Sequence, residues 1–265
     1  MRVFLVALLV GGISPAIMAA DPWADRVISY NPGLGDGTYT NPGTALGQPT
    51  RFTGVGIFPG AVTPFNPAWM ETELVSIGGG GHLTLAFDEP VLNNPDNPYG
   101  IDLLIFGNAG FIDIDYPNGI VGGLFGRSGA ARVELSSDGQ VWVTATGVAP
   151  DGLFPTLGYL DLTDPYSAAP GNVLSDFTRP VDPAFDPMGM TFAQIVAGYK
   201  GSGGGAGVDI GAFGLGSVSY VRFTNLSSNP VAYQIDALAA VAPTPGVLAL
   251  LGMFAGAGLR RRRCL

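Results

Sequence analysis

The stretch HLTLAFD, residues 82–88, alternates large apolar side chains with small or polar ones. Successive side chains of an extended chain point to opposite faces. The two leucines and Phe87 therefore share one face, and His82, Thr84 and Ala86 share the other. This period of two predicts a β-strand that buries one of its faces in a core.

Six further stretches are β-branched, aromatic or alternating, and we expect each to form a strand. They are RVISY (26–30), IDLLIF (101–106), RVELS (132–136), QVWVTA (140–145), VSYVRFT (218–224) and YQIDALAAV (233–241). Asp138-Gly139 predicts a hairpin between two of them, because both residues tolerate positive φ.

Helical patterns are rare in this chain. Only PGTALG (42–47) and TFAQIVAGY (191–199) suggest short helices, and residues 146–190, rich in Pro, Asp and Gly, suggest long surface loops. The sequence therefore predicts an all-β chain, with a single jelly-roll-like β-sandwich over residues 21–242.

The composition agrees with this fold class and excludes others. Hydrophobic residues make up 47% of the 265 residues and charged ones 12%, which is too apolar for a disordered chain, and the 41 Gly and 22 Pro are too many for a mainly helical one. Five of the twelve basic residues are Arg2 and Arg260–Arg263, so the 21 acidic residues dominate the rest of the chain. An acidic surface repels phosphate backbones, which argues against nucleic acid as a partner. The single cysteine, Cys264, excludes an intramolecular disulfide and a cysteine-based zinc site.

Residues 1–20 have the layout of a secretory signal peptide. Arg2 precedes an apolar stretch, a Gly-Pro break and the small residues Ala19 and Ala20. A buried N-terminal helix is the alternative, but Asp21-Pro22 follows at once, and the apolar run is too short to span a membrane. We expect signal peptidase to cleave after Ala19 or Ala20.

Residues 243–265 form a second address signal with three parts. In order, these are a turn of Pro243, Thr244, Pro245 and Gly246, an uncharged run over 247–259, and the cluster of Arg260, Arg261, Arg262 and Arg263. We expect the apolar run to enter the membrane as a helix, with the arginines as a topology stop on the cytoplasmic side. Burial of this segment in a protein core is excluded, because burying four charges is prohibitively costly.

This tail resembles the PEP-CTERM sorting signal, which combines a short proline motif, an apolar helix and a terminal arginine cluster. Pro-Thr-Pro stands here where that family usually has Pro-Glu-Pro. The resemblance implies a Gram-negative bacterium in which an exosortase-type protease removes the tail after transient anchoring in the inner membrane. It also implies delivery to the cell surface or extracellular matrix.

The body is similar to a group of exported bacterial surface proteins with a galactose-binding-type jelly roll. The matching pieces are WADRVISYNPG, ALGQPT, VSIGGGGHLTLAFDEPVLNNP, GIDLLIFGNAGF, ARVELSSDGQVWV, GVDIGAFGL and YQIDALAAV. The resemblance implies a shape related to carbohydrate-binding modules, with no activity attached. Gly107 and Ala212 stand where the group usually has acidic residues, so two candidate cation ligands of the group are missing.

Calcium is the cofactor that the acidic residues suggest. In FIDIDYPNG, Asp113 and Asp115 point the same way on an extended segment, Asn118 adds an amide oxygen and Gly119 permits a sharp turn. Three residues are only half of a calcium site, and the spacing is not that of an EF-hand. The outer candidate ligands are Asp102, Asp209 and Asp236. The alternative interpretation is that these acids cap turns.

Catalytic constellations are scarce. His82 is the only histidine, so a Ser-His-Asp triad depends on it alone, and none of the four Glu residues lies in a recognisable motif. The stretch GYKGSGGGAG (198–207) lacks the Gly-Lys-Ser/Thr order of a phosphate loop, and we interpret it as a flexible loop. The sequence therefore predicts a protein that is not an enzyme.

Exposed aromatic side chains suggest a binding function instead, because their flat faces stack on sugar rings. Trp69, in the loop FNPAWMETE, and Tyr116 are the candidate platforms. We therefore expect a non-catalytic surface or matrix protein. The alternatives are a carbohydrate-binding module for exopolysaccharide, assisted by calcium, and more remotely a secreted hydrolase.

Overall fold

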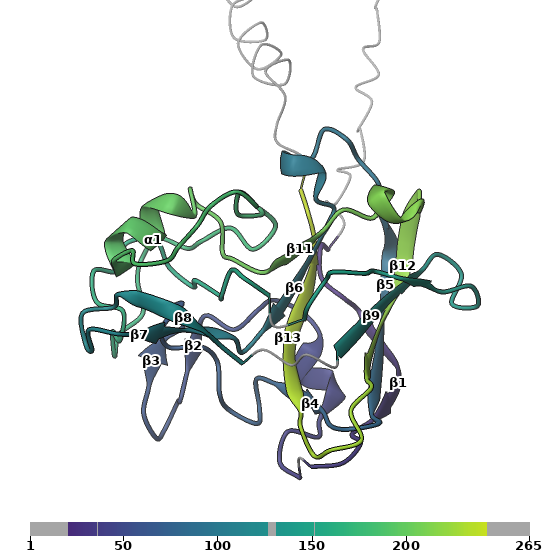
Figure 1. Cartoon of the computed structure of the whole chain (residues 1–265), viewed down its shortest axis with the longest axis horizontal. Coiled ribbons are helices and arrows are strands. Elements are labelled where there is room, and N and C mark those ends of the chain that lie inside the picture. Colours follow the sequence, from purple (N-terminus) through teal and green to yellow (C-terminus); the bar gives the residue numbers. More distant parts are fainter. Residues whose placement is uncertain (1–20, 36, 127–130, 151, 243–265) are drawn as a thin grey trace, which may run out of the picture.

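The computed structural model describes residues 21–242 except 36, 127–130 and 151 (Figure 1). The signal peptide and sorting tail that the sequence predicts lie outside the described residues. The named strands pair antiparallel, and the described chain has a single α-helix, so the predicted all-β class is confirmed. Within these residues no helix is long and apolar enough to cross a membrane.

The larger sheet has five strands. Their order across the sheet is β1 (Arg26–Asn31), β5 (His82–Leu92), β12 (Ser217–Asn225), β9 (Ala131–Ser136) and β10 (Val143–Thr144). The predicted hairpin joins β9 to β10, with Val143 opposite Leu135. Strand β10 is shorter than the predicted strand 140–145, because Asp138 accepts hydrogen bonds from the N–H groups of Gln140 and Val141 and so curls the chain into a loop.

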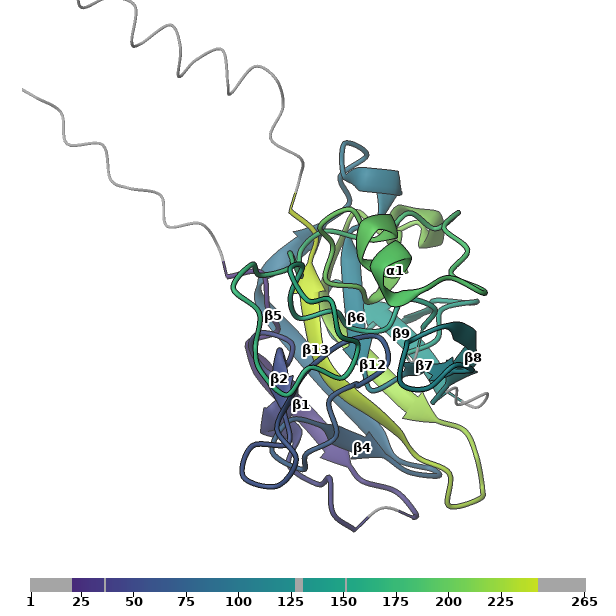
Figure 2. The ribbon, with the colours of Figure 1, turned by 90° about the vertical axis from the view of Figure 1, so that its left-hand side faces the viewer.

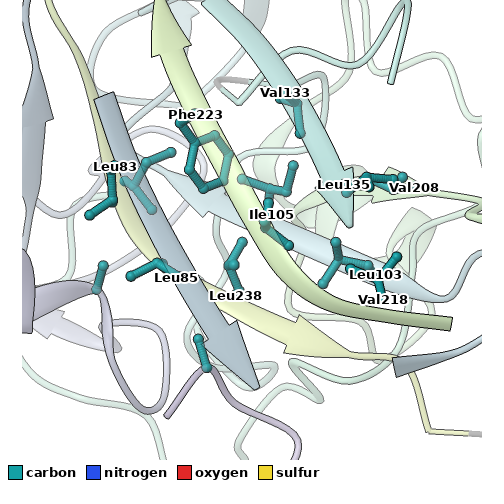
Figure 3. Close-up of a cluster of buried hydrophobic side chains, with 14 of the residues drawn as sticks. Leu83, Leu85, Leu103, Ile105, Val133, Leu135, Val208, Val218, Phe223 and Leu238 are labelled. Atoms are coloured by element: carbon teal, nitrogen blue, oxygen red, sulfur yellow. The ribbon is translucent and has the colours of Figure 1, made fainter. Parts of the chain in front are cut away.

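The smaller sheet has four strands and packs face to face against the larger one. Its order is β11 (Ala206–Val208), β6 (Leu103–Gly107), β13 (Tyr233–Ala240) and β4 (Val75–Ile77). Leu83 and Phe223 of the larger sheet meet Ile105 and Leu238 of the smaller one in the main core (Figure 3). The apolar face that alternation assigns to β5 is thus the face that packs on the second sheet.

The outer face of the four-stranded sheet is covered by the chain between β10 and β11. Phe177 packs against Phe106 with ring centroids 5.3 Å apart, and the same cluster includes Leu104 and Ala239. Because both faces are buried, β6 carries a continuous apolar run, and β13 does so over its second half, from Ala237 to Ala240. Figures 1 and 2 show α1 and the loops before it beside this sheet, on the side away from β5 and β12.

This covering segment corrects two expectations. Residues 146–190 are not only surface loops, because Phe154, Leu157 and Val181 are buried in a second core with α1. Residues 198–207 are not a free loop either. Leu157 donates its N–H to Gly203, Gly203 donates to Asp176, and a side chain at Gly203 would collide with Phe177.

The remaining elements are short. They are β2 (Phe52–Thr53), β3 (Gly60–Ala61), β7 (Gly110–Asp113), β8 (Val121–Phe125), the 3-10 turns η1 (Pro42–Ala45), η2 (Pro98–Gly100) and η3 (Gly211–Phe213), and the helix α1 (Phe192–Gly198). The predicted helix at 191–199 is confirmed, and Thr191 and Gln194 form its capping box. At 42–47 the chain forms only a 3-10 turn.

The two ends of the described chain lie side by side. Trp23 forms a bridge to Ala239, and Ala240 donates its backbone N–H to Pro22 at 2.7 Å. Asp21 and Ala242 therefore leave the two sheets at the same end of the molecule (Figure 1).

Candidate functional site

The outer face of the five-stranded sheet carries polar side chains, and part of it forms a hollow that is open to solvent. The strand register sets side chains of four strands in transverse rows on this face. One row contains Ser29, Thr84, Arg222 and Glu134, from β1, β5, β12 and β9 in that order. The adjacent row contains His82, Thr224 and Arg132. Alternation on each strand thus gathers polar groups from distant parts of the chain.

These two rows line a hollow of about 250 Å3. Its lining residues are Ser29, His82, Thr84, Arg132, Glu134, Arg222 and Thr224. The short side chains Ser29 and Thr84 form its floor, where the Ser29 hydroxyl lies 3.1 Å from Thr84 Oγ1. The long side chains of the two arginines stand beside this floor and give the face its depth.

Glu134 is the only carboxylate of the hollow within the described chain, and it holds the two arginines. Arg222 Nε donates to Glu134 Oε2 at 2.9 Å, and Arg132 Nε lies 3.5 Å from the same oxygen. Burial would raise the pKa of Glu134, but the hydrogen bond and charge of Arg222 and the charge of Arg132 outweigh it and lower the pKa. Glu134 is therefore ionised at neutral pH, and the two guanidinium groups leave one positive charge in excess.

An aromatic side chain borders this polar group. The guanidinium carbon of Arg222 lies 4.0 Å from the centroid of the Trp142 ring, a cation–π contact that fixes the ring over the sheet. Trp142 is half-buried in the loop before β10. The alternation in QVWVTA does not show on which face of the sheet Trp142 lies. Its contact with Arg222 places it on the outer face.

No single stretch of sequence predicts this site, although each of its strands carries part of the signal. VSYVRFT places Arg222 and Thr224 on one face, and RVELS does the same for Arg132 and Glu134. The polar residues of each strand look like an ordinary solvated face. Only the pairing of β5, β12 and β9 shows that these faces are contiguous.

Asp113 caps a turn in the structure. Its carboxylate accepts hydrogen bonds from the N–H groups of Asp115, Gly119 and Ile120 and from the Tyr166 hydroxyl. Burial alone would raise the pKa of Asp113, but these four bonds lower it. Asn118 turns its amide nitrogen, not its oxygen, towards Asp115 Oδ2 at 3.1 Å. The geometry of this stretch matches the turn-capping alternative.

The outer calcium candidates do not share one site, because Asp102 and Asp209 lie near the start of β6 and Asp236 lies near its other end. Asp102 is buried and accepts bonds from Asn94 N, Asn97 Nδ2 and Ile210 N. Asp209 accepts a bond from the N–H of Ala212. Asp236 is buried and accepts two bonds from Thr50. Across the described residues, no three Asp, Glu, His or Cys side chains gather into a group that fits a metal ion.

The two aromatic residues predicted to bind sugar do not line the hollow. Trp69 is half-buried, and its ring lies against Gly54 under the β2–β3 turn, whose own Val55, Ile57 and Phe58 are exposed. Tyr116 is 74% exposed at the β7–β8 connection, and its ring centroid lies 5.1 Å from that of Tyr166. Neither residue is among those that line the hollow on the outer sheet face.

His82 lies at the start of β5 and lines the hollow. A catalytic triad requires a serine that is hydrogen-bonded to the histidine and a carboxylate that orients it. Within the described chain His82 makes no such bond to a serine or carboxylate. The hollow offers hydrogen-bonding groups that a ligand can contact.

A second, larger cavity of about 610 Å3 lies between β11 and the covering segment. Its lining is mainly apolar and includes Ile101, Leu124, Phe154, Val181 and Met188. None of its described lining residues is charged, whereas the hollow on the outer sheet face brings Arg132, Glu134 and Arg222 together. No protein-family model and no curated protein matches this sequence.

Proposed function

We propose that this protein is exported to the cell surface or extracellular matrix of a Gram-negative bacterium, where it binds exopolysaccharide without catalysing a reaction. In this proposal the two sheets form a galactose-binding-type jelly roll, and the outer face of the five-stranded sheet is the binding face. The observation that carries the proposal is the uncovered polar hollow beside Trp142.

The chemistry of this face suits a carbohydrate. Sugar hydroxyls both donate and accept hydrogen bonds, and Ser29, Thr84 and Thr224 offer hydroxyl groups that do the same. Trp142 adds an aromatic edge next to these polar groups. The hollow is smaller than the pockets of about 300–1,000 Å3 that enclose whole small-molecule ligands. It therefore suits one unit of a longer chain that runs across the sheet.

The position of the chain ends supports display on a surface. Asp21 and Ala242 adjoin the predicted signal peptide and sorting motif, and both lie at the same end of the molecule. While the tail (243–265) anchors the protein in the membrane, the outer face of the five-stranded sheet stays clear of the anchor. Once exosortase-type cleavage has removed the tail, the same face is available in the matrix.

The test of binding is a screen of the exported protein against immobilised neutral and acidic polysaccharides, with and without EDTA. We expect retention on at least one polymer. Replacing Ser29 by Trp fills the floor of the hollow and should weaken that binding at least about tenfold, which is the effect of about 1.4 kcal/mol. Replacing the neighbouring exposed Ile28 by Trp is the control and should leave binding unchanged. Absence of binding to every polymer would contradict the proposal.

Sorting is tested by mass spectrometry of the protein recovered from the cell surface. We expect its C-terminus between Pro243 and Gly246 and its N-terminus at Ala20 or Asp21. An intact terminal RRRRCL on surface protein would overturn the sorting step and leave the binding proposal untouched.

A further inference from the structure

We infer that the hollow binds an acidic sugar, with Arg132 as the residue that holds the carboxylate of a uronate unit. This inference rests on the proposed function, since it names the kind of polysaccharide that the outer sheet face takes. It is carried by an imbalance of hydrogen-bond donors and acceptors in the hollow.

The carboxylate of Glu134 is already shared by several donors. Its Oε2 accepts from Arg222 Nε at 2.9 Å and from the Thr224 hydroxyl at 3.4 Å. Arg132 Nε lies 3.5 Å from this oxygen, is buried, and has no hydrogen-bond partner among the described residues. A buried N–H without a partner is costly, so Glu134 leaves Arg132 only partly satisfied. The Arg132 side chain is still 39% exposed, and its terminal N–H groups rather than Nε are the ones that a ligand can reach.

The terminal nitrogens of both guanidinium groups are also free of hydrogen bonds to other described residues. Among those residues, the bond from Arg222 Nε to Glu134 is the only hydrogen bond that either guanidinium group donates. Arginine presents its N–H groups in a rigid fork that matches the two oxygens of a carboxylate. The hollow therefore has an excess of donors arranged for a planar oxyanion.

The hollow holds more basic groups than acids. The other ion pairs of the described chain, Arg26–Asp88 and Lys200–Asp182, each join one basic residue to one acid. In the hollow two guanidinium groups share one carboxylate. A single added negative charge balances the site. A uronate supplies this charge, whereas a phosphate monoester carries nearly two charges at neutral pH.

The overall acidity of the chain does not prevent this binding. Salt at physiological ionic strength screens charges beyond about 8 Å, so the distant carboxylates of the protein act weakly on a group inside the hollow. The two guanidinium groups act at contact distance, where screening is slight. The hydroxyl groups of Ser29 and Thr84, next to Arg222 in the row, then face the ring hydroxyls of the same sugar unit.

The experiment compares three polymers at physiological salt: polygalacturonate, which carries carboxylates, dextran sulfate, which carries sulfate esters, and neutral dextran. We expect the exported protein to bind polygalacturonate most tightly. Arg132→Gln should weaken this binding about 10- to 100-fold, the usual range for a charge-assisted hydrogen bond. Arg26→Gln removes the same charge from the same sheet outside the hollow, and should leave binding unchanged.

Arg132→Lys keeps the charge and loses the fork, so an intermediate affinity is expected. Thermal unfolding of each variant shows whether the fold is intact, and Arg132→Lys keeps the test decisive if Arg132→Gln is unstable. Equal binding of polygalacturonate by the wild type and Arg132→Gln would overturn the inference. Tighter binding of dextran sulfate would assign the site to a sulfate ester instead. Preference for neutral dextran would overturn the inference and retain the proposed function. Binding of none of the three polymers would also overturn the inference, and the proposed function would fall only if the wider polysaccharide screen found no binding either.

Discussion

Thr50 donates two hydrogen bonds to the carboxyl group of Asp236, which lies 186 positions further along the chain. Its N–H lies 2.9 Å from Oδ2 and its hydroxyl 2.9 Å from Oδ1. Asp236 lies where the register of β13 against β6 shifts, between Ile235 and Ala237, and it is buried. Burial raises its pKa to about 7, although the hydrogen bonds from Thr50 oppose the shift.

The raised pKa of Asp236 predicts a loss of stability as the pH rises. In the unfolded chain this carboxyl titrates near 3.8. Between that pH and about 7 only the folded state holds the proton. The proton bound to Asp236 therefore stabilises the folded state fully below about pH 4. This stabilisation, on the order of 4 kcal/mol, is lost as the pH rises to about 7. Asp236→Asn cannot ionise, so its stability relative to the wild type should improve from pH 5 to pH 8. Urea denaturation at both pH values checks this, and a constant difference between the two proteins would refute it.

Asp113 predicts the opposite pH dependence. Its pKa is lowered in the folded state, so its stabilisation is present above the unfolded value and is lost as the pH falls through the folded one. Asp113→Ala leaves the N–H groups of Gly119 and Ile120 without their acceptor and should cost about 1–3 kcal/mol at pH 7. The loss should shrink as the pH falls below about 4. Denaturation curves from pH 7 to pH 3 measure it.

The same residue provides a test of calcium binding. The four donors around Asp113 are protein groups, so the turn needs no cation to hold its shape. We expect EDTA to leave the thermal midpoint of the wild type unchanged. A fall of the midpoint in EDTA that calcium alone reverses would contradict this and restore the predicted calcium site.

Gly203 fixes the covering segment against the four-stranded sheet. A Cβ atom at this position would meet the ring of Phe177, which packs on Phe106. Gly203→Ala should therefore destabilise the protein by about 1–3 kcal/mol through overpacking. Gly216→Ala is the matched control, because a Cβ atom added there would meet no heavy atom within 4 Å. Equal unfolding free energies for the two variants would show that the covering segment moves aside for the added methyl group at no cost in stability.

Replacing Trp142 should weaken ligand binding while changing the stability of the fold only slightly. Its ring lies over Arg222 at the edge of the hollow, in a loop rather than in the core. We expect Trp142→Ala to weaken polysaccharide binding about tenfold or more, as aromatic anchors of interfaces do, with a small change in stability. Val141→Ala removes a neighbouring exposed side chain and should leave binding unaltered. Titration calorimetry and thermal unfolding of both variants measure the two effects.

Much of the fold follows from local patterns in the sequence. The alternation in HLTLAFD correctly assigns Leu83 and Leu85 to the core, and the capping residues Thr191 and Gln194 mark the one α-helix of the described chain. The smaller strands such as β2 and β4 escape prediction, because two or three residues carry too little periodicity. The flexible-loop prediction for 198–207 was wrong because glycine is used there for close packing, not for freedom.

The sequence alone thus determined the all-β class, the strands with one polar face and the acidic character of the chain, because each depends on residues close together or on composition. Tertiary structure decided which polar faces became a site. β5, β12 and β9 are distant in sequence, and their register alone brings Thr84, Arg222 and Glu134 into one row. Packing likewise buried Asp236 against Thr50. Such pairings depend on long-range contacts between strands, which no local pattern specifies.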